Sequence, residues 1–190
     1  MTRFRNRIVL VSLLILSGFS VQAHDHAHTD DNLAAAHVHG QAELNIVIEQ
    51  GEAFAEWQTP LDNLLGFEHV PATDAQKQRY TALRESMQSV DAVFTLVDGQ
   101  CVQHGVELNQ PFVGHHEHNH DGHDHQHDEH GHFELQATYH LKCAEGDAIT
   151  GLVTNLFARY PRLQSIHVQL INNRGQQAFE LTPAKPNQRW

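Results

Sequence analysis

The chain has 190 residues, of which 23 are acidic and 12 are Lys or Arg, so its formal net charge at pH 7 is −11. This acidic balance argues against nucleic acid and anionic lipid surfaces as partners, and it favours cations. Histidine is abundant, with 18 residues, whereas only two cysteines are present.

Residues 1–23 predict a secretory signal peptide. Three arginines precede an apolar run at residues 8–19 that is too short to span a bilayer, and Val21-Gln22-Ala23 provides a cleavage site. No later segment is long and apolar enough to cross a membrane. We therefore expect residues 24–190 to form one exported domain without membrane insertion, with an uncleaved anchor as the alternative.

The expected mature chain begins with a short histidine tract at residues 24–28. If cleavage follows Ala23, His26 is the third residue, and its imidazole can join the free amine and two backbone amides in a square-planar set of four nitrogens. That set suits Cu(II) or Ni(II). The alternative is a flexible end that only adds imidazoles.

Alternation of apolar and polar residues from 42 to 49 predicts a half-buried strand, and residues 50–52 are typical of a turn into a second strand at 53–58. His37-Val38-His39-Gly40 leads into the first strand, and an extended backbone there would direct His37 and His39 to the same side. Pro60 opens an irregular stretch at residues 60–69, which ends in His69.

Thr73 and Gln76 have the pattern of a capping box and predict the start of a helix. Strands are predicted at about residues 93–97 and at 102–108. The apolar residues at helical spacing are expected in the core: Tyr80, Leu83, Met87, Val90 and Phe94.

Residues 115–132 (HHEHNHDGHDHQHDEHGH) differ most from an ordinary globular sequence. Nine of these 18 residues are histidine, five are acidic and none is apolar. A segment without apolar residues cannot offset its ordering entropy, so we expect a disordered loop in the absence of metal. Its imidazoles and carboxylates are ligands for first-row metals. The alternative is an acidic linker without a binding role.

Residues 133–143 predict the clearest strand, whose apolar face includes Cys143. Residues 147–160 predict a helix that Pro161 ends, and a strand at 166–170 directs His167 outward. Residues 172–175 are typical of a hairpin turn to a final strand at 177–181. Together these elements predict an α+β fold, a single domain with a mainly antiparallel sheet of about six strands, two helices and the His/Asp-rich loop.

Cys101 and Cys143 lie on either side of the His-rich loop. In an exported chain two cysteines more often form a disulfide than a metal pair, so we expect a bridge that tethers the two flanks of the loop. Ligation of a metal by thiolates is the alternative.

Zn(II) is the ion expected for neutral imidazoles with some carboxylate. Overlapping ligand sets in the loop would let an ion exchange from one set to the next, and this favours buffering or transfer over catalysis. Because the ligands must be deprotonated, binding should weaken as the pH falls through about 6.5, the reference pKa of histidine. The candidate ligands in the loop are His115, His116, His118, His120, His123, His125, His127, His130 and His132.

Residues 116–120 match the H-E-x-x-H signature of zinc proteases, which needs a buried helix with the glutamate as general base. A polar tract that is half histidine produces such a match by chance. We therefore expect no enzyme, and a zinc-dependent hydrolase is retained only as an alternative. A copper- or nickel-binding protein for metal resistance is another alternative.

Three histidines outside the loop, His37, His39 and His69, are candidates for a more rigid site on the domain. Lone surface histidines are usually solvated polar residues, and we assign His104, His140 and His167 to that class. For the first three residues, both interpretations stay open on the basis of the residues alone.

Five motifs occur together in this chain: His37-Val38-His39-Gly40, PLDNLLGFEH at 60–69, the His/Asp loop running into a strand that ends in Cys143, FARYP at 157–161, and LTPA at 181–184 with the end at Trp190. Together they resemble the ZrgA-type zinc uptake proteins, which are zinc-regulated periplasmic proteins of Gram-negative bacteria. The resemblance implies a periplasmic Zn(II)-binding protein that works beside a high-affinity zinc ABC importer and passes zinc to its solute-binding component. It also favours His37, His39, His69 and the loop histidines as ligands.

Overall fold

Strands dominate the part of the chain that the structure, a computed structural model, describes: residues 38–112 and 133–190. The strands there are β1 (Gln41–Glu49), β2 (Glu52–Pro60), β3 (Thr95–Val97), β4 (Cys101–Leu108), β5 (Glu134–Cys143), β6 (Gly151–Val153), β7 (Ser165–Asn172), β8 (Gly175–Leu181) and β9 (Asn187–Arg189). The helices are α1 (Leu61–Leu65), α2 (Asp74–Ser86) and α3 (Leu156–Arg159), with short 3-10 helices η1 (Val90–Ala92) and η2 (Gly146–Ala148).

Six of these strands form one mixed sheet in the order β4-β5-β2-β1-β7-β8, and β3, β6 and β9 form a second, smaller sheet. Within the larger sheet only β1 and β7 pair in parallel, and the other neighbours are antiparallel. The two-residue turn between β1 and β2 has positive φ at both Gln50 (52°) and Gly51 (81°), which matches the twist of a tight hairpin.

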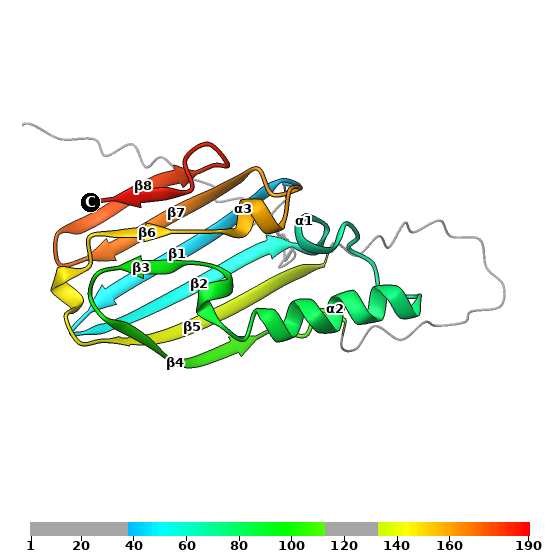
Figure 1. Ribbon diagram of the computed structural model, residues 1–190, viewed down its shortest axis with the longest axis horizontal. Coiled ribbons are helices and arrows are strands. Elements are labelled where there is room, and N and C mark those ends of the chain that lie inside the picture. Colours follow the sequence, from blue (N-terminus) through cyan, green and yellow to red (C-terminus); the bar gives the residue numbers. More distant parts are fainter. Residues whose placement is uncertain (1–37, 113–132) are drawn as a thin grey trace, which may run out of the picture. The chain divides into compact units, whose positions relative to one another are not determined.

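The core lies on one face of the six-stranded sheet. In β1 and β5, every second residue is buried, as the alternation in the sequence predicts. Helix α2, helix α3 and the small sheet cover that face (Figure 1), and Leu83, Met87 and Leu156 from this covering layer are buried in the same cluster. The opposite face of the large sheet carries the exposed residues of the alternation.

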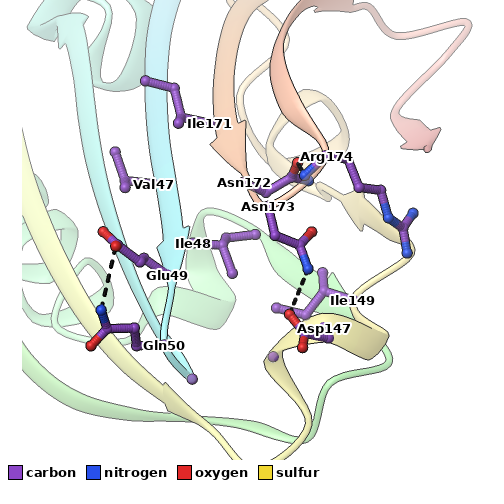
Figure 2. Close-up of a pocket in the computed structure, with 12 residues that line it drawn as sticks. Val47, Ile48, Glu49, Gln50, Asp147, Ile149, Ile171, Asn172, Asn173 and Arg174 are labelled. Carbon is purple, nitrogen blue, oxygen red and sulfur yellow. Dashed lines mark hydrogen bonds between the residues drawn. The ribbon is translucent and has the colours of Figure 1, made fainter.

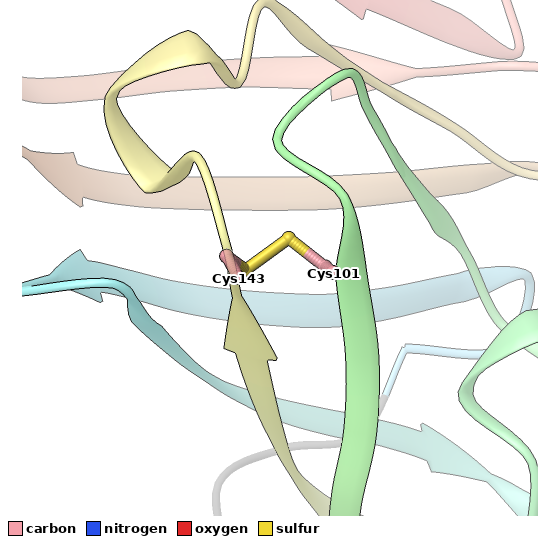
Figure 3. The surroundings of a disulfide bond; sticks show 2 residues. All are labelled: Cys101 and Cys143. Carbon is pink, nitrogen blue, oxygen red and sulfur yellow. A yellow bond between two sulfur atoms is a disulfide. The ribbon is translucent and has the colours of Figure 1, made fainter.

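The predicted disulfide is confirmed. Cys101 and Cys143 face each other in the β4–β5 register and are bonded, with a sequence separation of 42 (Figure 3). The predicted His-rich loop therefore lies in the connection of an antiparallel hairpin. The bridge is at the start of β4 and the end of β5, which is the opposite end of the hairpin from that connection.

The predicted helix at 147–160 is wrong. This segment contains η2, strand β6 and only one helical turn, α3. Gly151 lies against the backbone of β9, where an added Cβ would be 2.7 Å from the carbonyl oxygen of Gln188. The hydroxyl of Thr154 donates a hydrogen bond of 2.6 Å to the carbonyl of Val93. Pairing with distant strands overrides the helical spacing of the apolar residues here.

The prediction of two helices and about six strands is therefore too low on both counts. The stretch predicted as irregular at 60–69 contains helix α1, and the chain end forms strand β9. The capping box at Thr73 and Gln76 is confirmed at the start of α2. That helix ends at Ser86, so Met87, Val90 and Phe94 reach the core from the cap and η1 rather than from a continued helix.

The predicted signal peptide at 1–23 and the histidine tract at 24–28 lie outside the described residues, as does the loop at 115–132. In the parts of the chain that are described, no helix has the length and apolar character needed to cross a membrane.

Candidate metal centre

His39 lies in a tight turn that leads into β1. The amide of Gln41 donates a hydrogen bond of 3.1 Å to the carbonyl of Val38, and Gly40 occupies the third position of this turn with φ of +83°. A residue with a side chain rarely adopts that conformation, so the turn requires the glycine that follows His39. The extended geometry predicted for residues 37–40 is therefore wrong over residues 38–40.

Asn63 joins this turn to helix α1. Its buried side chain accepts a hydrogen bond of 2.7 Å from the amide of Gly40 and donates one of 2.8 Å to the carbonyl of Gln41. A third bond, of 3.0 Å, links it to the hydroxyl of Thr59 at the end of β2. Because every polar group of this amide has a partner, the start of β1 is held in one position relative to α1.

An ion pair holds the other side of α1. Arg162 donates hydrogen bonds to both carboxylate oxygens of Asp62, at 2.7–3.1 Å, and the Asp62 side chain is only 12% exposed. The helix then ends at Gly66, whose φ of +80° turns the chain into the segment that carries Glu68 and His69. The hydrogen bonds of Asn63 and the Asp62–Arg162 ion pair thus hold helix α1, from which the segment with Glu68 and His69 begins.

Glu68 is the partner of His39. The Nε2 atom of His39 lies 3.1 Å from each carboxylate oxygen of Glu68. Two atoms that share a tetrahedral zinc ion at 2.0–2.1 Å are themselves about 3.3 Å apart. The pair therefore already has nearly the spacing of two ligands on one ion, with the imidazole 53% exposed.

His69 lies next to Glu68 in the chain, and its ring is oriented by neighbours. Its Nδ1 donates a hydrogen bond of 2.9 Å to the carbonyl of Val70, which leaves Nε2 as the nitrogen with the lone pair. A bond from the ring to a carbonyl is the usual support for a metal-binding histidine. Here Nε2 faces the side-chain amide of Gln76 at 3.5 Å, and Phe67 packs against the ring.

The two ends of the β4–β5 connection are anchored beside α2. The rings of Tyr80 and Phe133 each pack against Phe112, with centroids 4.9 and 4.8 Å apart. Asn109 donates a side-chain hydrogen bond of 2.9 Å to the carbonyl of Glu134, and its own carbonyl accepts a hydrogen bond from Arg84. The described flanks of the His-rich segment are thus fixed even though residues 113–132 are not described.

The sheet register brings these elements to one end of the molecule's large sheet. Gln41 at the start of β1 pairs with Ser165, and Pro60 at the end of β2 pairs with Glu134 at the start of β5. The His39 turn, helix α1, the end of β4 and the start of β5 are therefore at the same sheet end (Figure 1). His37 and the loop histidines lie outside the described residues, so their positions relative to His39 are predictions.

Sequence reasoning missed Glu68 as a candidate ligand. The only signal is its position directly before His69, because its contact with His39 spans 29 residues of sequence. Within residues 38–112 and 133–190, no three His, Cys, Asp or Glu side chains are grouped so that they could already hold a metal ion. The described part of the centre is thus the His39–Glu68 pair, and His69 follows Glu68 in the chain without being grouped with the pair.

The other end of the large sheet has a different character. A cavity of about 600 Å³ is formed there by the β1–β2 turn, η2 and the β7–β8 turn (Figure 2). Asn173 donates a hydrogen bond of 2.7 Å to Asp147 in this cavity, and Ile48, Ile149 and Ile171 form its apolar part. Its lining contains no histidine or cysteine, so it lacks the nitrogen and sulfur ligands of a zinc site.

The profile of the ZrgA family zinc uptake proteins matches residues 36–190. The chain belongs to this family. Membership indicates a role in zinc uptake, and the family is one of zinc uptake proteins rather than of enzymes. No curated protein matches the chain. The match includes the His39 turn, Glu68, His69 and the whole β4–β5 hairpin, so the family relationship covers the candidate centre as well as the core.

Proposed function

We propose that this chain is a non-enzymatic periplasmic protein that captures and buffers Zn(II) and supports its import. It would release the ion to the solute-binding component of a zinc ABC importer. The observation that carries this proposal is the convergence at one sheet end: the His39 turn enters β1 at the same end where β4 ends and β5 begins, and these two strands flank the His-rich segment in the chain.

The proposed mechanism has two parts. Histidines 115–132 capture ions through exchangeable imidazoles, and the acidic residues among them raise the local concentration of divalent cations. A more ordered site then holds the ion, with His39 and Glu68 as ligands and with His37 and His69 as further candidates. Each transfer replaces one imidazole at a time, so the ion moves without losing all of its ligands at once.

Calorimetric titration of Zn(II) into residues 24–190, with and without residues 115–132, tests this proposal. We expect the deletion to remove several weak sites and to leave one tighter site, which His39→Ala then weakens. His167→Ala is the matched control, because this exposed histidine of β7 also faces a glutamate, Glu180 of the edge strand β8, but at a longer separation of 4.0 Å. Unchanged zinc binding after the deletion would contradict a capture role for the segment.

A second titration tests hand-over and metal identity. Zinc-loaded protein is mixed with the apo solute-binding component, and zinc in each protein is measured after separation. Faster transfer than the spontaneous release rate into a chelator supports direct hand-over, whereas equal rates contradict it. Competition among Cu(II), Ni(II) and Zn(II), each at the free concentration found in the periplasm, distinguishes zinc import from copper or nickel resistance. The concentrations must be matched in this way because Cu(II) outcompetes Zn(II) at most nitrogen sites.

A further inference from the structure

Three side chains that can bind metal meet on the open face of the large sheet. His140 lies on β5, between Glu52 on β2 and His104 on β4, and these three strands are neighbours. The Nε2 atom of His140 is 3.4 Å from a carboxylate oxygen of Glu52. The rings of His104 and His140 are nearly perpendicular, with centroids 5.1 Å apart. Sequence reasoning assigned both histidines to the solvated surface.

The His140 nitrogen is not satisfied by these neighbours. Its Nε2 is shielded from solvent and has no hydrogen-bond partner, although the carboxylate of Glu52 is close. A buried polar atom of this kind costs free energy unless something pairs with it. The 3.4 Å separation without hydrogen-bond alignment matches the spacing of about 3.3 Å between two atoms that share a tetrahedral zinc ion.

The second imidazole also has a suitable position. Two imidazoles on one tetrahedral zinc ion have ring centroids about 5 Å apart, given Zn–N bonds of 2.0–2.1 Å. The observed separation of 5.1 Å is close to this value. The alternation in β4 after Val102 places His104 on this face, and it is the extra residue of a bulge, where the register shifts between Gln103 and Gly105.

Two further features hold His140 and the strands in place. Phe54 stacks on the His140 ring, with centroids 4.4 Å apart and planes 6° from parallel, and this contact fixes the plane of the ring. The Cys101–Cys143 disulfide joins β4 to β5 three positions from both histidines. The spacing of the two strands is therefore fixed before any ion binds.

We propose that Glu52, His104 and His140 form a second site for one first-row divalent cation, such as Zn(II), on the open face of the sheet. The three side chains do not yet converge on one point, and the exposed His104 completes the site by rotating about its side-chain bonds. His140 is six residues along β5 from Glu134, so this site is about 20 Å from the end where the His-rich segment begins. It does not depend on the proposed hand-over role.

Paramagnetic broadening of backbone amide signals tests this site in the full exported chain, residues 24–190, because the effect reports where an ion binds. Co(II) is the probe, and Zn(II) is the competitor. We expect the amides of Glu52, Gly105 and His140 to broaden, as a zone separate from the one around His39, and we expect Zn(II) to reverse the effect. His104→Gln should require at least about tenfold more Co(II) for the same broadening.

Two substitutions make the test decisive. His140→Gln should abolish the broadening around Glu52, Gly105 and His140. Because this substitution also removes the contact between His140 and Phe54, His104→Gln provides a second test in which that contact is kept. His167→Gln is the matched control, since His167 also faces a glutamate, Glu180, on the same sheet face at 4.0 Å, but lies on β7 rather than on β4 or β5. Broadening confined to the His39 end, or a second zone that survives His104→Gln unchanged, would overturn the proposal.

Discussion

Cys101 and Cys143 are directly opposite each other across β4 and β5, so their disulfide closes the hairpin at the end away from the His-rich segment. The bridge and the hydrogen bonds of Asn109 hold the same two strands at their two ends. The hairpin is therefore fixed on both sides of His104 and His140.

Replacing both cysteines by serine should lower the free energy of unfolding by about 3–4 kcal/mol, because the bridge closes a long chain segment in the unfolded state. Urea denaturation of the oxidised protein and the double variant measures this difference. The wild-type protein treated with reductant is the control and should behave like the variant. A loss below about 1 kcal/mol would contradict the expectation.

Glu68→Gln should weaken the tighter zinc site that remains after deletion of 115–132 by at least about tenfold, because it removes a negative ligand beside His39. Stability should change little, since the His39–Glu68 pair is partly exposed and such pairs contribute about 0–1 kcal/mol. Calorimetry gives the affinity and thermal unfolding gives the stability. Glu85→Gln in α2, an exposed glutamate, is the control and should change neither.

Arg162→Met should destabilise the protein by about 2–3 kcal/mol, because it leaves the nearly buried Asp62 carboxylate without its charged partner. It should also weaken the same zinc site, since α1 and the Glu68 segment lose an anchor. Denaturation and zinc titration measure the two effects. Arg79→Met is the control, because Arg79 is exposed on α2. Adding Asp62→Asn should restore part of the stability.

Tyr139 should make stability depend on alkaline pH. Burial, with a smaller effect of Tyr160, raises the pKa of Tyr139 well above its usual value of about 10, and its hydroxyl donates a hydrogen bond of 2.8 Å to the carbonyl of Met87. The folded state keeps the proton that the unfolded state loses. The contribution of protonated Tyr139 to the free energy of unfolding is therefore complete below pH 10 and declines above it by about 1.4 kcal/mol per pH unit.

The variant Tyr139→Phe tests whether stability falls at alkaline pH because Tyr139 ionises. At pH 7 the variant should be less stable by about 1–2 kcal/mol, because the Met87 carbonyl loses its donor. Above pH 10 the difference from the wild-type protein should shrink, and denaturation series from pH 7 to pH 11 would show it. A constant or growing difference would mean that ionisation of Tyr139 is not linked to unfolding.

Local patterns predicted the elements in which each residue's role depends on its neighbours in sequence. The alternation in β5 and the capping box at Thr73 are of this kind, and both are confirmed. The disulfide, also confirmed, spans 42 positions and was predicted because the chain has only two cysteines. The segment at 147–160 failed because Gly151 serves a close approach to β9, a strand that lies about forty residues later and has no signal of its own.

The candidate site divides in the same way. Histidine content marked the region proposed to bind metal, but the proposed role of Glu68 follows only from its contact with His39 across the fold. His104 and His140 are separated by 36 positions and meet because β4 and β5 pair, with His104 at a bulge beside His140. Neither the bulge nor the unsatisfied nitrogen of His140 can be predicted from the spacing of apolar residues.

The position of the His-rich segment within a hairpin has an evolutionary consequence. The entropic cost of closing a connection between two fixed strand ends grows only with the logarithm of its length, so doubling the connection costs about 0.6 kcal/mol. Insertions and deletions between Phe112 and Phe133 can therefore change the number of imidazoles while the β4–β5 register and the disulfide stay the same. Under the proposed capture role, the number of ions that the segment holds can therefore change separately from the selection that maintains the domain.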